Sequence, residues 1–313
     1  MNKHSETSHD PIGLGILFGG GAALIWGAWP VITALGVQAS LSPLQLVMLR
    51  IFVSAPLLLP WVFRGRNSWR EWRRVLLLSL LAGAPYSFIA SSGFSYTSAT
   101  HGGVIIPGTI MLTSLFASHF FLHDRLNRFR ILGAIGILVG LALLAFGAAG
   151  GGNSASLIGD LIFAAAGVLW ASYTLLLRLW PMDPVVVTAR VAFVSLFWVG
   201  AALPFTGIPD FSDIPTDMLT LQIVWQGTIS SVLAIIFFNK GVAILGAARA
   251  SVLNAIIPVV STLLAFFILS EVPTGLEQAG LLSILIGIFI AMFLTPKPQQ
   301  KPHNKPVVTS PEN

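Results

Sequence analysis

Apolar runs of membrane-spanning length recur along the whole chain. A bilayer core requires about 20 consecutive apolar residues in each helix. Runs of about this length cover residues 13–36, 44–63, 75–96, 102–122, 131–148, 157–179, 185–204, 219–238, 248–269 and 276–295. Short polar segments separate them, so neighbouring helices should be antiparallel. The pattern predicts an all-α integral membrane protein with ten transmembrane helices.

The two ends of the chain are polar. Residues 1–12 precede the first apolar run, and residues 296–313 are rich in proline and lysine, a composition typical of disorder. The first apolar run is longer than the core of a signal peptide, and no small-residue cleavage pattern follows it. We therefore expect it to be retained as the first transmembrane helix, between two polar tails.

The charges support a membrane protein and predict its orientation. Charged residues make up 9% of the chain, whereas a soluble domain carries about 25%. The basic residues between the runs fall on alternate segments: Lys3, Arg64, Arg66, Arg70, Arg73, Arg74, Arg125, Arg128, Arg130, Arg178, Lys240, Arg249, Lys297, Lys301 and Lys305. The opposite segments carry acids instead: Asp210, Asp213, Asp217, Glu271 and Glu277. By the positive-inside rule both termini are cytoplasmic, and the net charge of +5 reflects topology rather than a nucleic-acid partner.

The two halves of the chain resemble each other. At a shift of 144 residues Gly15 and Trp26 match Gly159 and Trp170, and at a shift of 147 Gly133 and Gly140 match Gly280 and Gly287. Each half holds five helices, and because five is odd the halves must have opposite orientations. We therefore expect a first repeat over 13–148, an outer linker over 149–156 and a second repeat over 157–295. Inverted repeats favour alternating access around a central site, although channels also contain them.

The ordered motifs of the two repeats resemble a known family. The first half has Ala-Ala-Leu-Ile-Trp-Gly at 22–27, Leu-Arg-Ile-Phe at 49–52 and Tyr-Thr-Ser-Ala at 96–99, and the second has Val-Leu-Trp-Ala at 168–171 and Gly-Ala-Ala-Arg-Ala-Ser at 246–251. Together they resemble EamA-type carriers of the drug/metabolite transporter superfamily over about residues 13–295. The resemblance implies export or exchange of small metabolites across a bacterial inner membrane. It also implies a central cavity lined largely by helices 3, 4, 8 and 9.

Two arginines lie inside apolar runs. Arg50 and Arg190 are each about six residues from a helix end, roughly 9 Å deep. An arginine within the membrane is costly, so each either extends its side chain to the nearer interface or has a specific partner. Asp160 lies at a similar depth to Arg50 and is a candidate for a structural ion pair with it. The residue equivalent to Asp160 for Arg190 is Ile16, which leaves Arg190 for a substrate anion or a gate.

The start of the fourth run combines a histidine with helix-weakening residues. His101 precedes two glycines and Pro107. Irregular backbone at membrane depth is tolerated where it faces protein or a watery cavity. We therefore place the segment 101–108 at the binding cavity, with a packing kink as the alternative. A protonatable His101 would link transport to pH. Asn254 and Pro258 are the corresponding candidates in the second half.

Further candidates are aromatic and polar residues at membrane depth. Trp26 and Trp170 are equivalent in the two repeats and serve either as packing anchors or as cavity walls. Tyr86 and Gln226 would supply polar contacts to a substrate in the same cavity.

The leading functional hypothesis is a secondary transporter of small organic solutes such as amino acids or drugs. The chain has no cysteine, no His-Glu-x-x-His motif and no phosphate-binding loop, which argues against an enzyme, a cofactor or a metal. A channel-like or sensory protein is the alternative. The expected partners are a small molecule and the lipid bilayer, and the sequence leaves a homodimer open.

Overall fold

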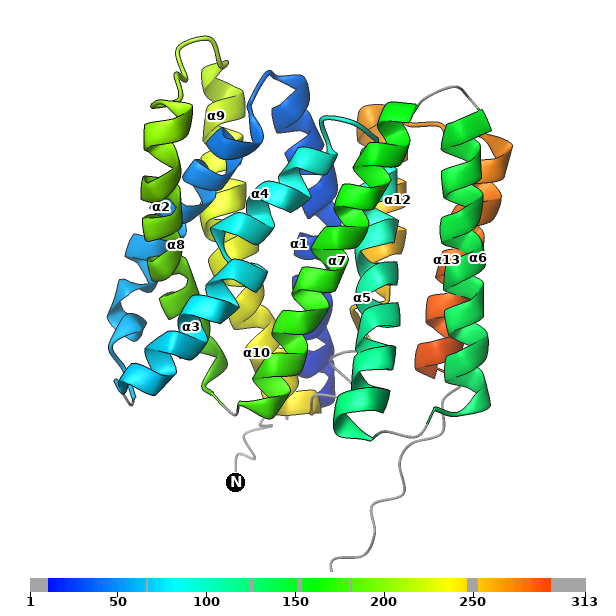
Figure 1. Ribbon diagram of the computed structural model, residues 1–313, viewed down its shortest axis with the longest axis horizontal. Coiled ribbons are helices and arrows are strands. Elements are labelled where there is room, and N and C mark those ends of the chain that lie inside the picture. The colour runs from blue at the N-terminus through cyan, green and yellow to red at the C-terminus, as the bar shows by residue number, and fades with distance from the viewer. Residues whose placement is uncertain are drawn as a thin grey trace, which may run out of the picture.

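The computed structural model describes residues 11–65, 67–123, 126–150, 154–180, 182–246 and 253–293, and these residues form a helical bundle (Figure 1). The helices are α1 (Pro11–Gln38), α2 (Pro43–Val62), α3 (Trp69–Ala82), α4 (Ala84–Gly93), α5 (Ala99–Leu122), α6 (Arg128–Gly150), α7 (Ser154–Leu179), α8 (Pro184–Thr206), α9 (Thr216–Gln222), the π-helix η1 (Ile223–Leu233), α10 (Ala234–Leu245), α12 (Ile256–Leu269) and α13 (Gly275–Phe293). The predicted all-α membrane fold is confirmed.

The helices form the expected membrane crossings. Within the described residues nine spans are long and apolar enough to cross a bilayer, with α3 and α4 forming one span and α9, η1 and α10 another. The tenth predicted helix, 248–269, is represented by the shorter α12, because residues 247–252 lie outside the described part of the chain. Figure 1 shows α1 beginning and α13 ending on the same side. We call this the inner side, as the basic residues assign it.

Some sequence predictions concern residues that the structure does not describe. These are the polar tails at 1–10 and 294–313, the residues Arg66, Asp124, Arg125 and Arg249, and residues 151–153 of the predicted outer linker.

The contact between α6 and α13 displays the inverted repeat most directly. A Cβ atom added to Gly133 would lie 2.5 Å from the carbonyl oxygen of Gly287, and one added to Gly287 would lie 2.6 Å from that of Gly133. Gly140 and Gly280 form the same reciprocal pair, at 2.5 and 2.9 Å. These four glycines are the ones matched at a shift of 147. Gly133 packs on the equivalent of Gly140, and Gly140 packs on the equivalent of Gly133, which is the reciprocal contact that a two-fold relation between the halves produces. Small residues permit this close approach of two helices.

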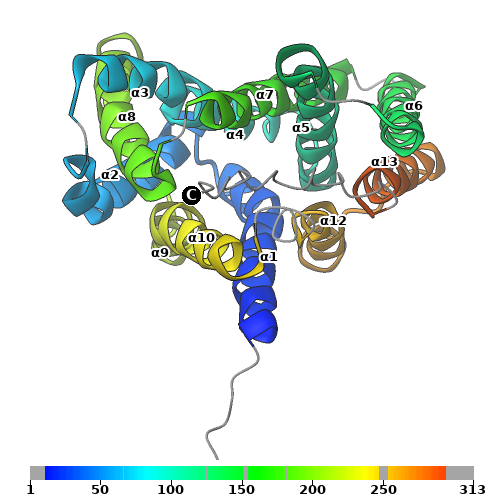
Figure 2. The same ribbon diagram turned by 90° about the horizontal axis from the view of Figure 1, so that it is seen from below.

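The other helix contacts follow the same symmetry. α1 packs on α10 and α12 of the second half, and its equivalent α7 packs on α4 and α5 of the first half. α2 packs on α8, its own equivalent. Viewed from below, the pair of α6 and α13 lies at one edge of the bundle, while α1, α4, α5, α7, α10 and α12 surround its middle (Figure 2).

The third helix of each half is irregular. The predicted run 75–96 begins earlier, because Ser68 caps α3 at Trp69, and it breaks at Gly83. Gly83 leaves room for the hydroxyl of Ser195, which accepts a 3.0 Å hydrogen bond from the backbone N–H of Ala84. In the second half the equivalent span contains the π-helix, a form that often marks functional sites.

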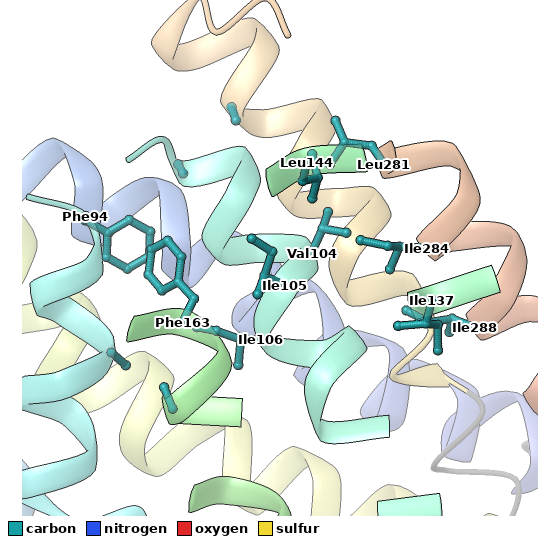
Figure 3. Packing of buried hydrophobic residues seen from close by; sticks show 14 of the residues in the cluster. Phe94, Val104, Ile105, Ile106, Ile137, Leu144, Phe163, Leu281, Ile284 and Ile288 are labelled. Carbon is teal, nitrogen blue, oxygen red and sulfur yellow. The ribbon is translucent and has the colours of Figure 1, made fainter. Parts of the chain in front are cut away.

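A buried apolar cluster joins the two halves of the bundle. Figure 3 shows Phe94 and Phe163 in contact on one side, Val104 of α5 beside Ile284 on the other, and Ile105 between them. The Phe94 and Phe163 rings pack edge to face with centroids 4.7 Å apart. Ala34, Ala90 and Ala99 also belong to this cluster.

Candidate functional site: a cavity with one arginine

A cavity of about 380 Å³ lies in the middle of the bundle. Its lining consists of Trp26, Trp29, Pro30, Arg50, Tyr86, Gly102, Gly103, Ile106, Pro107, Ile110, Met111, Ser114, Trp170, Ser230, Asn254, Ala255, Ile257, Pro258, Ile288 and Met292. The third, fourth, eighth and ninth membrane spans, which the resemblance implied, contribute through α4, α5, η1 and residues 254–258. The helices α1, α2, α7 and α13 contribute as well. The lining runs from Gly102 and Gly103 in the first turn of α5, at the outer side, to Met292 near the inner end of α13, so the cavity extends through much of the depth of the bundle.

Aromatic side chains make up much of the wall. Trp26 and Trp170, the equivalent residues of the two repeats, both line the cavity, and the Tyr86 ring lies 5.1 Å from the Trp170 ring. Trp26 donates a 3.3 Å hydrogen bond to the carbonyl oxygen of Ser230 in η1. Tyr86 reaches the cavity from the first turn of α4, directly after the break at Gly83.

Arg50 is the one charged side chain among the described residues that line the cavity. The predicted ion pair between Arg50 and Asp160 is wrong. Within the part of the chain that the structure describes, no carboxylate lies within 4 Å of the Arg50 guanidinium, and Asp160 contacts His101 instead. The prediction rested on depth alone, and the packing of α7 against α5 brings Asp160 to His101 instead.

Arg190 has a full set of partners away from the cavity. It donates hydrogen bonds to the carbonyl oxygens of Val62 and Arg64, at 2.8 and 2.9 Å, and to Asn67 Oδ1 at 2.8 Å. Its Nη1 lies 3.1 Å from Glu71 Oε2. The prediction that Arg190 remains available for a substrate anion is therefore wrong. Arg190 joins α8 to the connection between α2 and α3 on the inner side.

His101 is buried beside the cavity rather than in its lining. Its Nδ1 lies 2.7 Å from Asp160 Oδ1 on α7, and its Nε2 lies 3.6 Å from Glu277 Oε1 on α13. A third acid, Glu271, accepts 2.8 Å hydrogen bonds from the backbone N–H groups of Ala99 and Thr100. A carboxylate at a helix N-terminus accepts hydrogen bonds from the free N–H groups, and its negative charge interacts favourably with the positive end of the helix dipole. These contacts hold the outer end of α5 against the second repeat.

Gln226 also lies outside the cavity lining. Its side chain accepts a 2.9 Å hydrogen bond from Trp29 Nε1 and donates to Thr33 Oγ1 and Gln222 Oε1, at 3.0 and 3.2 Å. The Gln222 amide donates a 2.6 Å hydrogen bond to the carbonyl oxygen of Ile32. Gln226 thus connects η1 to α1 and positions Trp29, which does line the cavity.

The proline and asparagine candidates line the cavity. Pro107, Asn254 and Pro258 are all part of its wall. The segment 101–108 is helical throughout, within α5, so it borders the cavity without the irregular backbone that the sequence suggested. Asn254 Oδ1 is buried and accepts no hydrogen bond among the described residues, which leaves it available to a ligand.

Several lining residues were missed. Trp29 and Pro30 follow Trp26 at helical spacing, and this was the available signal for them. Ser114, Ser230, Ile288 and Met292 are ordinary residues in apolar helices, and only the packing of the helices reveals that they face the cavity.

Comparison with known proteins identifies the kind of protein that has this architecture. The profile of the EamA-like transporter family matches residues 13–146 and 157–293. An uncharacterized transporter from Archaeoglobus fulgidus is 22% identical over 276 residues, covering 85% of this chain and 93% of the relative. The uncharacterized transporter YoaV from Bacillus subtilis is 25% identical over 278 residues, covering 86% and 94%.

A solved crystal structure has the same fold. It superposes with a TM-score of 0.60 over 91% of this chain and 98% of its own, at 20% sequence identity. At this identity the likeness concerns the fold alone.

Proposed function

Since this chain belongs to the EamA-like transporter family, we propose that it is a secondary carrier for small organic carboxylates. In this proposal it moves them across the cytoplasmic membrane, by export or exchange, through alternating access to the central cavity. The observation that carries the substrate class is Arg50, which is the one charged side chain among the described residues that line this aromatic cavity.

The cavity volume sets the size of the solute. A water molecule occupies about 30 Å³ in the liquid, so about 380 Å³ holds roughly a dozen non-hydrogen atoms. This volume is at the lower end of the range for small-molecule sites. The rings of Trp26, Tyr86 and Trp170 favour a solute with a flat apolar body.

The charge of the cavity selects among solutes of this size. An arginine forms paired, charge-assisted hydrogen bonds with a carboxylate. A cationic drug would meet the guanidinium of Arg50, and no acid among the described lining residues would compensate its charge. The amide of Asn254 offers a neutral second contact. Carboxylates are therefore favoured over amines of the same shape.

Alternating access is supported by the inverted repeat and by the contacts between its halves at the outer end of α5. There Glu271 and Asp160 of the second half hold the first turn of α5, directly beside the cavity. Because the two halves are equivalent and inverted, they can exchange conformations, and this exchange would open the cavity to the opposite side of the membrane. A channel would instead need a continuous polar path.

Counterflow in proteoliposomes tests the proposal with three probes of one shape: 3-phenylpropionate, its neutral amide, and 3-phenylpropylamine. Vesicles loaded with unlabelled probe receive a trace of the labelled compound outside. We expect saturable, accelerated uptake for the carboxylate and little for the amide and the amine. Uptake that does not saturate would support the channel alternative, and equal uptake of all three probes would refute the role of charge.

The variant Arg50→Gln tests the residue that carries the proposal. A charged hydrogen bond contributes about 1.5–3 kcal/mol, so losing it should weaken carboxylate affinity roughly 10- to 100-fold. Arg70→Gln removes an exposed arginine on α3 and is the matched control. If both variants transport the carboxylate with wild-type affinity, Arg50 is not its ligand.

A further inference from the structure

Three acids from the second repeat surround one buried histidine of the first repeat. Asp160 Oδ1 lies 2.7 Å from His101 Nδ1, and Glu277 Oε1 lies 3.6 Å from Nε2. Glu271, in the connection between α12 and α13, binds the backbone of the two residues before His101. The side chains of His101, Asp160 and Glu277 are 5%, 9% and 18% exposed.

The geometry of this cluster suits the doubly protonated ring. A neutral imidazole has one N–H donor, whereas the imidazolium has two. Here both ring nitrogens face carboxylate oxygens, so only the imidazolium offers a proton to each. Glu277 Oε2 is occupied by the backbone N–H and the hydroxyl of Thr274, which leaves Oε1 for His101. Asp160 Oδ2 is buried and accepts no hydrogen bond among the described residues, so the contact of Oδ1 with His101 is the one that the structure gives this carboxylate.

The cluster lies where an outer opening would have to begin. His101 is in the first turn of α5, and the next two residues, Gly102 and Gly103, line the cavity. Its acidic partners are on α7 and α13. Separating the two repeats on the outer side would therefore separate the histidine from its acids and expose it to water.

We propose that His101, Asp160 and Glu277 form a proton-binding site that controls the outer opening of the transporter. A proton on the ring holds α5 against α7 and α13, and its loss leaves one ring nitrogen without a donor and weakens the closure. Outer opening is a step of the alternating-access cycle, so this inference rests on the proposed function. The ligand is a proton taken from the outer solution.

The chain has no cysteine, which allows a single reporter to be introduced. Ala90 on α4 is fully buried in the apolar cluster above the cavity, so A90C should react with a membrane-impermeant maleimide only when the outer side opens. Its rate is divided by that of D213C, at an exposed site in the outer connection, because thiol reactivity itself varies with pH. We expect this ratio to rise with outer pH by at most tenfold per unit, as one proton requires.

Substitutions then assign the pH dependence to the cluster. H101Q should make the labelling ratio independent of pH, whereas H119Q, at the inner end of the same helix, should leave it unchanged. D160N removes the charge that stabilises the imidazolium, so the midpoint should move to lower pH, and it decides the question if H101Q does not fold. A flat ratio in the A90C protein, a pH dependence that survives H101Q, or a midpoint that D160N leaves unchanged would overturn the proposal. Counterflow in the same vesicles separates the two ideas, because a failed pH response with saturable carboxylate counterflow refutes the proton site alone.

Discussion

Glu271 is the residue whose removal should most directly open the outer side. Its carboxylate comes from the second repeat and caps α5 of the first, by accepting from Ala99 N, Thr100 N and the Thr100 hydroxyl. Glu271→Ala removes the whole contact while leaving α5 and α13 intact. We therefore expect the variant to populate the outward-open state more often.

The size of the shift follows from the lost hydrogen bonds. Three bonds to a carboxylate are lost, each worth about 1.5–3 kcal/mol, but water replaces part of this because Glu271 is partly exposed. A net loss equal to one such bond, about 1.5–3 kcal/mol, would raise the outward-open population roughly 10- to 100-fold. Glu271→Gln keeps one acceptor oxygen and should have a smaller effect.

Labelling of A90C by an impermeant maleimide from the outside measures this population. The rate should increase by about the same factor in Glu271→Ala, provided that the open state is the minor one. Asp213→Ala, which removes an exposed acid from the outer connection, is the control. A rate that is equal in the control and in Glu271→Ala would refute the assignment of Glu271 to the outer closure.

Two further substitutions test the packing. Gly140→Ala places a Cβ atom 2.5 Å from the carbonyl oxygen of Gly280 and should destabilise the fold by about 1–3 kcal/mol. Its melting temperature in detergent should therefore fall. Gly200→Ala is the control, because its Cβ atom meets nothing within 4 Å and should not lower the melting temperature. Arg190→Gln should cost about 3 kcal/mol, the low end for a broken buried ion pair, because its partner Glu71 is 21% exposed. The affinity of the Arg190→Gln variant for the substrate, measured by counterflow, should be unchanged. A loss of affinity with normal stability would show that Arg190 does contact the substrate.

The fold could be predicted from the sequence because membrane helices leave strong signals. Run length predicted the helices, and the matched positions predicted the repeat. The alternation of basic segments predicts the orientation, which stays a prediction, and the contact of α6 with α13 was not predicted. The break at Gly83 and the π-helix after Gln222 were missed. The contact of Ser195 with the start of α4 is tertiary, and apolar periodicity does not record it. Pro85 in the first turn of α4 was the available sequence signal for the break at Gly83.

The cavity residues could be predicted only where repeat position and residue type agreed. Trp26, Trp170, Tyr86, Asn254 and the two prolines line the cavity, and their contact with a substrate stays a prediction. The charged residues were harder, because depth in the membrane does not determine the direction in which a side chain points. Asp160, the acid predicted to pair with Arg50, contacts His101 instead. Arg190 contacts the connection between α2 and α3 and its neighbour Glu71.

The most direct test of the account is the sidedness of a single cysteine in the cavity. Ser114 is partly exposed in the inner part of the cavity, so S114C should react readily with an impermeant maleimide from the inside. From the outside, S114C should be labelled slowly, and the double variant with Glu271→Ala should be labelled faster. When 3-phenylpropionate fills the cavity, the labelling rate should fall from both sides. This result would establish alternating access to one carboxylate site. Labelling from the inside alone, unaffected by Glu271→Ala or by the carboxylate, would contradict it.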